Sequence, residues 1–526
     1  MLRLATTCAT AALLLALTPQ QAGAQQGRQD ETPPEQSSAI AVPEERINQA
    51  VAKLDELAQE TLARTGIPGL AIAVVHGRDT LYAKGFGIRK AGAQERVDAD
   101  TVFQLASVSK SIGATVVAAE VGKGKIQWNT PVARDLPWFT LTDPWVGQHV
   151  TVGDLYAHRS GLPDHAGDDL EIVGFDRRQI LERLRWLPLD AFRAHYAYTN
   201  FGLVAAADAV AAAAGRDWAD LSQEDLYLPL GMAATSSRHA DFLKRTNRAA
   251  AHVRTAEGFK PLYTRAPDAQ SAAGGVSSSA NDMAKWMGMI LNEGKYQGRS
   301  VIPGDALLPA LTPQAVMQQP GSASTRAAFY GYGFVVSTRA SGRTMLMHSG
   351  AFEAGAATTF VMIPSLKLGI VVLSNAYPIG AVEALAMNFA DLAEYGRETQ
   401  DWARRYTELT APLTKPFGAL AGAKPPAHPQ PQLRPQAYAG TYFNDYFGRV
   451  EVAVRAGQLA LTIGPEKKTV ALKHWDGNRF VFDVPPPDSA AGSRSAVDFE
   501  PDDAGRITAM HVELLGQDGQ GDFVRR

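Results

Sequence analysis

Strand-like sequence at both ends of a long helical interval is the feature that most constrains the fold of this chain. Five segments are rich in β-branched or apolar residues and are bounded by turn-forming residues. They are residues 70–75, 80–85, 344–348, 358–363 and 368–373. Strands from both ends of one unit pair most simply in an antiparallel sheet, against which the intervening helices pack. This pattern predicts an α+β fold, with an antiparallel sheet flanked by helices.

A proline-rich stretch divides the chain, whose length of 526 residues already favours two domains. A helical stretch from about 382 to 409 precedes residues 411–435, which are dense in Pro, Ala, Gly and Gln and are typical of a linker. Short strands follow, separated by Gly, Asp, Asn and Pro. They are residues 450–454, 459–463, 470–473, 479–484, 497–499 and 508–514. We therefore expect one domain at 44–410 and a second at 436–526, a small antiparallel barrel or sandwich.

The N-terminus has the three parts of a secretory signal. Arg3 supplies the positive start, residues 9–17 a short apolar run, and Ala22-Gly23-Ala24 a cleavage site of small residues. We expect residues 1–24 to be removed as a signal peptide and residues 25–43 to form a flexible leader. The mature protein would then be periplasmic or secreted, with no stable membrane span. An uncleaved anchor is the alternative.

Composition excludes several classes of protein. The only cysteine, Cys8, precedes the apolar run, so a lipoprotein anchor is disfavoured and cleavage would leave no thiol for disulfides, nucleophiles or metals. Hydrophobic residues make up 45% and charged residues 20%, as in globular proteins. The net charge is −3 and no basic stretch interleaves with aromatics, so nucleic acid is not an expected partner. His158, Asp164 and His165 lack the spacing of a zinc site, and we expect no metal.

Ser107-Val108-Ser109-Lys110 opens an apolar, helix-like segment. Residues three apart on a helix share a face, so the hydroxyl of Ser107 and the amine of Lys110 can meet. Free N–H groups and the macrodipole at a helix N-terminus favour negative charge developing at Ser107. A buried lysine has a lowered pKa and can take part in proton transfer. Taken alone, this spacing also fits Ser107 as a helix cap and Lys110 as a solvated residue.

Tyr198-Thr199-Asn200 precedes a second helix-like run. A phenol is a poor base in water, but a neighbouring cationic lysine favours its ionised form. Tyr198 could then shuttle the serine proton, and Asn200 could hydrogen-bond Lys110 or the amide of a substrate. Taken alone, Tyr198 is as well explained as a half-buried core tyrosine.

His348-Ser349-Gly350 ends a strand that begins near residue 344. Gly350 would allow a substrate to approach the strand edge closely. The backbone N–H of Ala351, together with that of Ser107, would form an oxyanion hole. A single histidine is more often structural than catalytic, so His348 is a weak signal by itself.

Taken in order, S-x-x-K, Y-x-N and H-x-G resemble the motifs of the serine β-lactamase and D,D-peptidase superfamily, and in particular of its class C-like branch. Further similar segments follow one another in the same order across residues 45–400. They are GIPGLAIAVV (66–75), GFG (85–87), FQLASVSK (103–110), TVGDLYAHRSGLP (151–163), YTNFG (198–202), LPLGM (228–232) and GGVSSSANDMAKW (274–286). The C-terminal unit, beginning YAGTYFNDYFG (438–448), is similar to a barrel-like domain often appended to this branch.

The resemblance implies a sheet with an all-helical subdomain and a hydrolase that forms an acyl-enzyme. By it, Ser107 attacks the substrate, Lys110 and Tyr198 handle protons, and water releases the acyl group. Asn200 and His348 would help to hold the substrate and the lysine–tyrosine pair. No metal or organic cofactor is implied, and the oligomeric state stays open.

The H-x-G motif departs from the K-T-G of many β-lactamases and carboxypeptidases in this superfamily. A lysine there attracts a substrate carboxylate, whereas histidine is largely neutral at pH 7. H-x-G occurs in D-aminopeptidase-like peptidases and in esterase-like relatives. We therefore expect a peptidase or amidase that acts on small or linear peptides, including ones with D- or unusual residues. The alternatives are a carboxylesterase, a β-lactamase or D,D-carboxypeptidase, and a penicillin-binding sensor-like protein without turnover.

The specificity pocket is the part of the site that the sequence defines least. Aromatic residues on expected loops near the motifs are candidates to line it, although such residues more often pack in the core or on the surface. They are Trp138, Phe139, Trp145, Tyr330, Tyr332 and Phe352.

Overall fold

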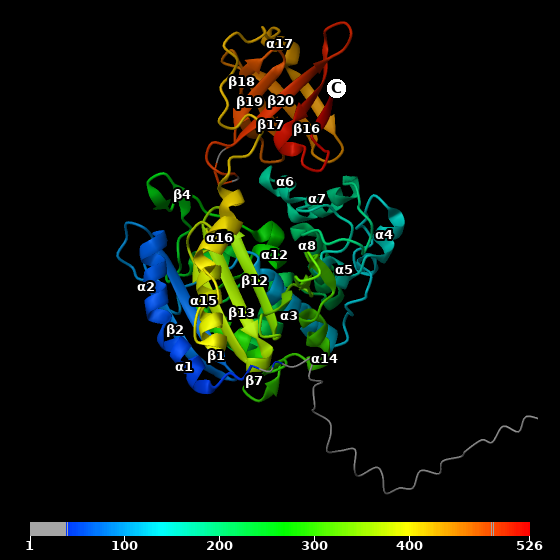
Figure 1. The fold of residues 1–526 in the computed structure, drawn as a ribbon. Helices are drawn as coiled ribbons and strands as arrows, with labels where there is room; N and C mark the ends of the chain where they lie inside the picture. The colour runs from blue at the N-terminus through cyan, green and yellow to red at the C-terminus, as the bar shows by residue number, and fades with distance from the viewer. Residues whose placement is uncertain (1–37, 39, 485, 488) are drawn as a thin grey trace, which may run out of the picture.

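The structure is a computed structural model (Figure 1). It describes residue 38 and residues 40–484, 486–487 and 489–526. The expected signal peptide, and most of the expected leader, lie outside the described residues. Among the residues that are described, no helix is long and apolar enough to cross a membrane.

An antiparallel sheet of eight strands forms the centre of the larger unit. Its order is β2-β1-β14-β13-β12-β11-β10-β9, so strands from the two ends of the unit lie side by side. The strands are β1 (Gly69–His76), β2 (Asp79–Gly87), β9 (Ala315–Gln318), β10 (Ala328–Tyr330), β11 (Val335–Thr338), β12 (Thr344–Phe352), β13 (Ala356–Ile363) and β14 (Leu368–Ser374). The arrangement confirms the predicted α+β fold. The three short strands β9 to β11 were not anticipated.

Alternate residues of β1 point to opposite faces of the sheet and pack into two cores. Leu70, Ile72 and Val74 pack in one core, and the small residues Ala71 and Ala73 in the other. The helices of the first core are α1 (Glu44–Ala52), α2 (Leu54–Thr65) and α15 (Ala381–Tyr395), and those of the second include α3 (Val108–Gly122) and α13 (Ala280–Leu291). Because both faces are covered, β13 and β14 are buried along their whole length.

The helical stretch expected from about 382 to 409 is in fact two helices. α15 ends at Gly396, which adopts a left-handed φ of +70°, and α16 (Trp402–Thr410) begins six residues later. A glycine in this conformation ends a helix at little steric cost, and this signal was overlooked in the sequence.

The interval between β2 and β9 is mainly helical. α8 (Asn200–Ala214) is buried along most of its length and packs on α5 (Val152–Tyr156) and on α3. The short helices α6 (Asp168–Ile172) and α7 (Arg177–Arg183) lie at the end of this region that faces the C-terminal unit (Figure 1).

The C-terminal unit is a closed antiparallel barrel, which decides between the predicted barrel and sandwich. Its strands are β15 (Gly440–Asn444), β16 (Gly448–Arg455), β17 (Gln458–Ile463), β18 (Lys468–Asp476), β19 (Arg479–Asp483), β20 (Arg494–Pro501), β21 (Ile507–Val512) and β22 (Asp522–Arg525). Pairing of Tyr442 with Arg525 and of Phe443 with Val524 joins the first strand to the last. These two closing strands were not anticipated.

Candidate active site

Ser107 lies at the start of α3, in a loop packed against β12 at Gly350. Ala106, immediately before it, has a φ of +46°. This left-handed conformation is strained for a residue with a side chain, and such strain is common at functional sites. Thr358 Oγ1 donates a hydrogen bond of 2.6 Å to the carbonyl of Leu105 in the same loop. The strained turn and this bond hold the Ser107 hydroxyl at the N-terminal end of the helix.

Lys110, one helical turn later, is completely buried. Its Nζ lies 3.1 Å from Ser107 Oγ, 2.6 Å from Asn200 Oδ1 and 3.1 Å from the carbonyl oxygen of Ala273. These three acceptors match the three N–H groups of an ammonium ion. The helical spacing thus brings the amine and the hydroxyl together, and Asn200 joins them from α8.

Burial lowers the pKa of Lys110 to about 7, and the negative charge of Asp168 opposes this shift only in part. Neutral and charged forms therefore coexist near neutral pH. The lone pair of the neutral amine needs a donor, and neither Asn200 Oδ1 nor the Ala273 carbonyl can donate. Of the three neighbours, only the Ser107 hydroxyl can, so the free base of Lys110 is directed at the serine proton.

Tyr198 faces the same pair of residues. Lys110 Nζ lies 4.5 Å from the centroid of the Tyr198 ring, and the phenol is a hydrogen-bond partner of the Ser107 side chain. Burial raises the pKa of Tyr198 above its ordinary value, the hydrogen bond to Ser107 opposes the rise, and the charge of Asp168 adds to it. The expectation that Lys110 favours the phenolate is therefore wrong, because burial dominates. Tyr198 keeps its proton at neutral pH.

Asn200 links Lys110 to a carboxylate that the sequence reasoning missed. Its Nδ2 donates to Asp168 Oδ2 at 2.8 Å while its Oδ1 accepts from Lys110, so the two charged neighbours fix the orientation of the amide. His165 Nδ1 lies 2.8 Å from the same oxygen of Asp168, and this contact raises the pKa of His165. In the sequence, Asp168-Asp169 has the appearance of the solvated first turn of a helix.

His348 lies beside this cluster, but its ring nitrogens have other partners. Nδ1 is 2.7 Å from the carbonyl of Ser349, which can only accept, so Nδ1 carries the proton and Nε2 accepts from the Tyr330 hydroxyl at 2.8 Å. Burial, with the charge of Lys110 adding to it, lowers the pKa of His348 to about 3. The ring is therefore neutral, as expected. Its centroid is 6.5 Å from that of Tyr198, so it contacts the pair through packing rather than through a polar bond.

A side chain at position 350 would collide with the protein's own backbone. This requirement for glycine is separate from the close approach of a substrate that the sequence predicts there. A Cβ at this position would lie 2.1 Å from the carbonyl oxygen of Leu105 and 2.9 Å from the backbone nitrogen of Ser107. β12 extends two residues beyond Gly350, to Phe352, so the motif lies within the strand rather than at its end. Ala351, the next residue, is exposed and paired with Ala357 of β13.

Packing explains several of the six aromatic candidates. Tyr330 and Phe139 are 1% exposed, and the ring of Tyr332 stacks on Trp128 at 4.3 Å between centroids. Trp145 is 57% exposed and stacks on His149. Two candidates adjoin the motif residues: Tyr330, whose hydroxyl bonds His348, and Phe352, which follows Ala351 on β12.

Comparison with models of protein families identifies the family of this chain. Residues 54–393, more than half of the chain, match the model of the beta-lactamase family. The chain belongs to the beta-lactamase family. It is therefore a serine hydrolase of this family, with an additional C-terminal closed barrel. Residues 424–522, which include most of the barrel, match a domain of unknown function (DUF3471).

Relatives within this family include hydrolases and peptidases. "Unguisins hydrolase ungD'" of Aspergillus campestris is 28% identical over 344 residues, which are 61% of this chain and 60% of that protein. "D-alanyl-D-alanine-carboxypeptidase/endopeptidase AmpH" of Escherichia coli is 23% identical over 350 residues, 64% of this chain and 87% of that protein. The match to the unguisins hydrolase thus spans less than two thirds of its length.

A solved structure shows the same fold. The octameric penicillin-binding protein homologue from Pyrococcus abyssi has a TM-score of 0.57 and 20% identity, and the alignment covers 90% of this chain and 100% of that one. At this identity the likeness concerns the fold alone. The alignment is long enough to take in part of the barrel as well as the larger unit.

Proposed function

We propose that this beta-lactamase-family hydrolase cleaves amide bonds in small or linear peptides, including peptides with D- or unusual residues, through an acyl-enzyme on Ser107. The observation that carries the proposal is the buried amine of Lys110, whose three hydrogen-bond neighbours include a single donor, the Ser107 hydroxyl. A nucleophile within hydrogen-bond reach of a base is the arrangement that acyl transfer requires.

In the proposed reaction, Ser107 Oγ attacks the carbonyl carbon of the substrate while its proton passes to neutral Lys110. The backbone N–H groups of Ser107 and Ala351 donate to the carbonyl oxygen as it becomes negative. The C–N bond then breaks: Tyr198 gives its proton to the leaving nitrogen and recovers one from Lys110. Water attacks the acyl-enzyme, one of its protons returns through the same groups to Ser107 Oγ, and the acid product leaves.

Two features support a peptide as the substrate. His348 is neutral, so it supplies no permanent cation to capture a carboxylate next to the scissile bond. β11 pairs with β12 only over Thr344–Met347, whereas β13 pairs with it as far as Phe352. Beyond Met347 no described strand pairs with the edge of β12 on the β11 side, and an extended peptide can add there as a strand. Asn200 and His348 would border such a peptide.

A carboxylesterase is the second candidate, because the same nucleophile and base cleave esters. The proton on Tyr198 separates the two activities: a leaving amine must be protonated, whereas p-nitrophenolate leaves without a donor. Tyr198→Phe should therefore lower the turnover of an amino-acid amide by at least the ~10²-fold typical of losing an acid–base group, and that of a p-nitrophenyl ester much less. Equal losses on both substrates would remove Tyr198 from the protonation of the leaving group.

The direct test is a substrate panel on the purified protein and on Ser107→Ala. The panel holds D- and L-amino-acid amides, terminal D-alanyl peptides, p-nitrophenyl esters and a chromogenic cephalosporin. We expect the highest kcat/KM on amides and no hydrolysis by Ser107→Ala. A preference for the cephalosporin or for terminal D-alanine would replace the proposal with a β-lactamase or carboxypeptidase. Permanent labelling by penicillin without turnover would indicate a sensor-like protein.

We also propose that residues 1–24 direct export. Fractionation of expressing bacteria should find the mature chain in the periplasm or the medium, and N-terminal sequencing should place its start after Ala24. Deletion of residues 2–24 should retain the protein in the cytoplasm. The proposal would be contradicted if the protein were found in the same compartment with and without residues 2–24.

A further inference from the structure

The barrel contacts a short helix that leads directly to the proposed catalytic residues. α6 lies beneath the barrel, where the two units meet (Figure 1). From the barrel, the Tyr446 hydroxyl donates to Asp169 Oδ1 at 2.6 Å, and Lys468 Nζ donates to the carbonyl of Ile172 at 2.6 Å. The barrel thus contacts both the first turn of α6 and its last residue.

The position of α6 depends on such outside contacts. The helix has five residues, too few to be stable by propensity alone, and its N-cap, Gly167, offers no side chain to its free N–H groups. Gly167 and Gly174, on either side of it, have left-handed φ values of +90° and +93°. The barrel packs tightly here: a Cβ at Gly464 would lie 1.9 Å from the carbonyl oxygen of Val173.

The other side of α6 faces the proposed active site. Asp168 accepts a hydrogen bond from Asn200 Nδ2 at 2.8 Å, and Asn200 Oδ1 accepts from Lys110 Nζ at 2.6 Å. Asp168 and Asp169 are neighbours in the chain. A continuous path therefore runs from the Tyr446 hydroxyl through the first turn of α6 to the amine of Lys110.

The contact between Tyr446 and Asp169 is partly shielded from water. Tyr446 is completely buried, and its ring packs edge-on against Phe447 of the barrel at 4.8 Å between centroids. Burial raises the pKa of Asp169 to about 7, the hydrogen bond from Tyr446 opposes the rise, and the charge of Asp518 adds to it. A partly buried carboxyl that loses its phenol partner must move or bind water, so the first turn of α6 would shift.

We propose that the barrel is a working part of the active site: Tyr446 is a positioning residue that holds α6 so that Asp168 keeps Asn200 against Lys110. The inference rests on the proposed function of Lys110 as the base for Ser107. It assigns the barrel a role in catalysis itself, apart from any effect on which substrates enter.

The test is Tyr446→Phe in the full-length protein, with the rate of Ser107 labelling by a fluorophosphonate as the readout. We expect labelling about tenfold slower, the size of effect that mutations along a coupling path produce. The matched control is Gln520→Ala, which removes another contact between the units, the 3.1 Å bond from Gln520 Nε2 to the carbonyl of Trp186, without touching α6. This control should label within twofold of the wild type.

A second pair of variants keeps the test decisive if Tyr446→Phe folds poorly. Asp169→Asn retains an acceptor for the Tyr446 hydroxyl and should keep the wild-type labelling rate, whereas Asp169→Leu should reproduce the slow labelling of Tyr446→Phe. Hydrogen exchange of residues 165–173 should be faster in the slow variants only. Wild-type rates and unchanged exchange in Tyr446→Phe and Asp169→Leu would overturn the inference.

A double variant separates positioning from a general loss of stability. If Tyr446 acts through Asp168, adding Tyr446→Phe to Asp168→Asn should slow labelling no further than Asp168→Asn alone. The charge of Asp168 raises the pKa of Lys110, so both single variants should move the acid limb of kcat/KM to lower pH. If the two substitutions slowed labelling additively and left the pH profile of kcat/KM unchanged, Tyr446 would contribute only to the stability of the fold. A wild-type protein that is not labelled at all would instead defeat the proposed function.

Discussion

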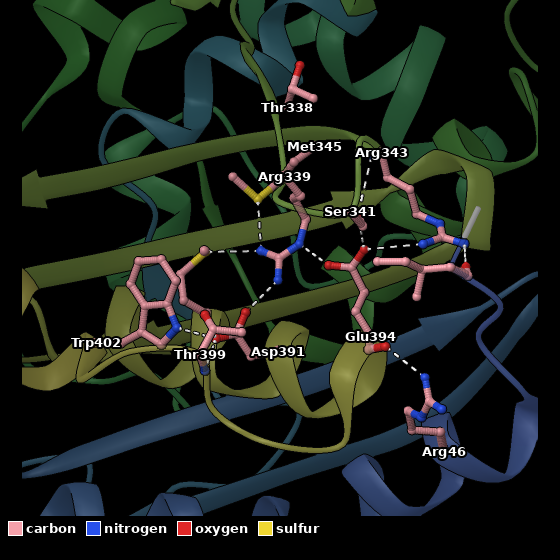
Figure 2. A network of polar contacts seen from close by, with 12 residues as sticks. Arg46, Thr338, Arg339, Ser341, Arg343, Met345, Asp391, Glu394, Thr399 and Trp402 are labelled. Carbon is pink, nitrogen blue, oxygen red and sulfur yellow. Dashed lines mark hydrogen bonds and ion pairs between the residues drawn. The ribbon is translucent and has the colours of Figure 1, made fainter. Parts of the chain in front are cut away.

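Two buried cations, Lys110 and Arg339, have opposite surroundings. The guanidinium of Arg339 contacts two buried carboxylates, Asp391 at 2.7 Å and Glu394 through its Nε (Figure 2). In the part of the chain that the structure describes, the hydrogen-bond partners of Lys110 are three uncharged oxygens, and the carboxylate of Asp168, which acts on it electrostatically, is bonded to the far side of Asn200.

The partners of Arg339 are themselves satisfied. Asp391 Oδ2 accepts from the backbone and side chain of Thr399 and from Trp402 Nε1, and Glu394 Oε1 accepts from Ser341 (Figure 2). These bonds tie the hairpin between β11 and β12 to α15 and to the segment that leads into α16. Full compensation keeps a buried charge in place, whereas the incomplete compensation of Lys110 makes it give up a proton near neutral pH.

The largest expected effect is on the activity of Lys110→Met. Removal of the base should lower kcat/KM by about 10³- to 10⁴-fold on an amide. The free energy of unfolding should stay the same or rise, because a buried amine without a carboxylate partner is replaced by an apolar side chain of similar length. Steady-state kinetics and urea unfolding measure both quantities, and Lys125→Met, an exposed lysine just beyond α3, is the matched control. Near-wild-type activity of Lys110→Met would show that Lys110 is not the base.

Arg339→Met should have the converse effect. It leaves two buried carboxylates without their cation, so the free energy of unfolding should fall by about 3–5 kcal/mol. The fraction that stays folded should keep the wild-type kcat, because this cluster lies under α15, on the face of the sheet away from α3. The check is urea unfolding beside active-site titration of the folded protein. A loss of kcat per labelled site would show that the cluster also serves catalysis.

Sequence reasoning reached the parts of the fold and of the active site that local spacing encodes, and it reached no part of the Arg339 cluster. The apolar runs of the long strands and the helical spacing of Ser107 and Lys110 are visible within a few residues of chain. Strands of three or four residues, such as β10, are too short to show a period. Asp168 lies 32 residues before Asn200, and Tyr446 lies 277 residues after Asp169, so their contacts depend on the tertiary fold. For the same reason the phenolate expected of Tyr198 was wrong: burial, which spacing does not report, decides its pKa.

The comparison also predicts a pH profile for activity. The pKa of Lys110 is about 7 and only its neutral form accepts the serine proton, so kcat/KM should fall about tenfold per pH unit below pH 7 and level off above it. The neighbouring His348 has a pKa of about 3 and stays neutral throughout this range. Stopped-flow labelling of Ser107 with a fluorophosphonate from pH 5 to 9 measures this fall in rate. The Asp168→Asn variant should move its midpoint to lower pH, because the negative charge of Asp168 raises the pKa of Lys110. A flat profile would mean that Lys110 does not gate the reaction.

The smallest expected effect is the contribution of Lys110 to the free energy of unfolding in alkaline solution. The pKa of Lys110 is about 7 in the folded protein and about 10.4 for an ordinary lysine in the unfolded chain. Between these pH values the unfolded state binds more protons at Lys110 than the folded state does. Lys110 therefore makes the free energy of unfolding rise with pH, by up to about 1.4 kcal/mol per pH unit. Below pH 7 both states are protonated and the contribution is constant.

Lys110→Met should remove this slope, and the control variant Lys125→Met should keep it, because it leaves Lys110 in place. Urea titrations between pH 7.5 and 9.5 measure the difference between each variant and the wild type, in which the titrations of groups remote from the substituted residue cancel. Equal slopes in wild type and Lys110→Met would show that the folded protein keeps Lys110 charged. Tyr198 would then remain next to a permanent ammonium ion, and the serine would need a different base.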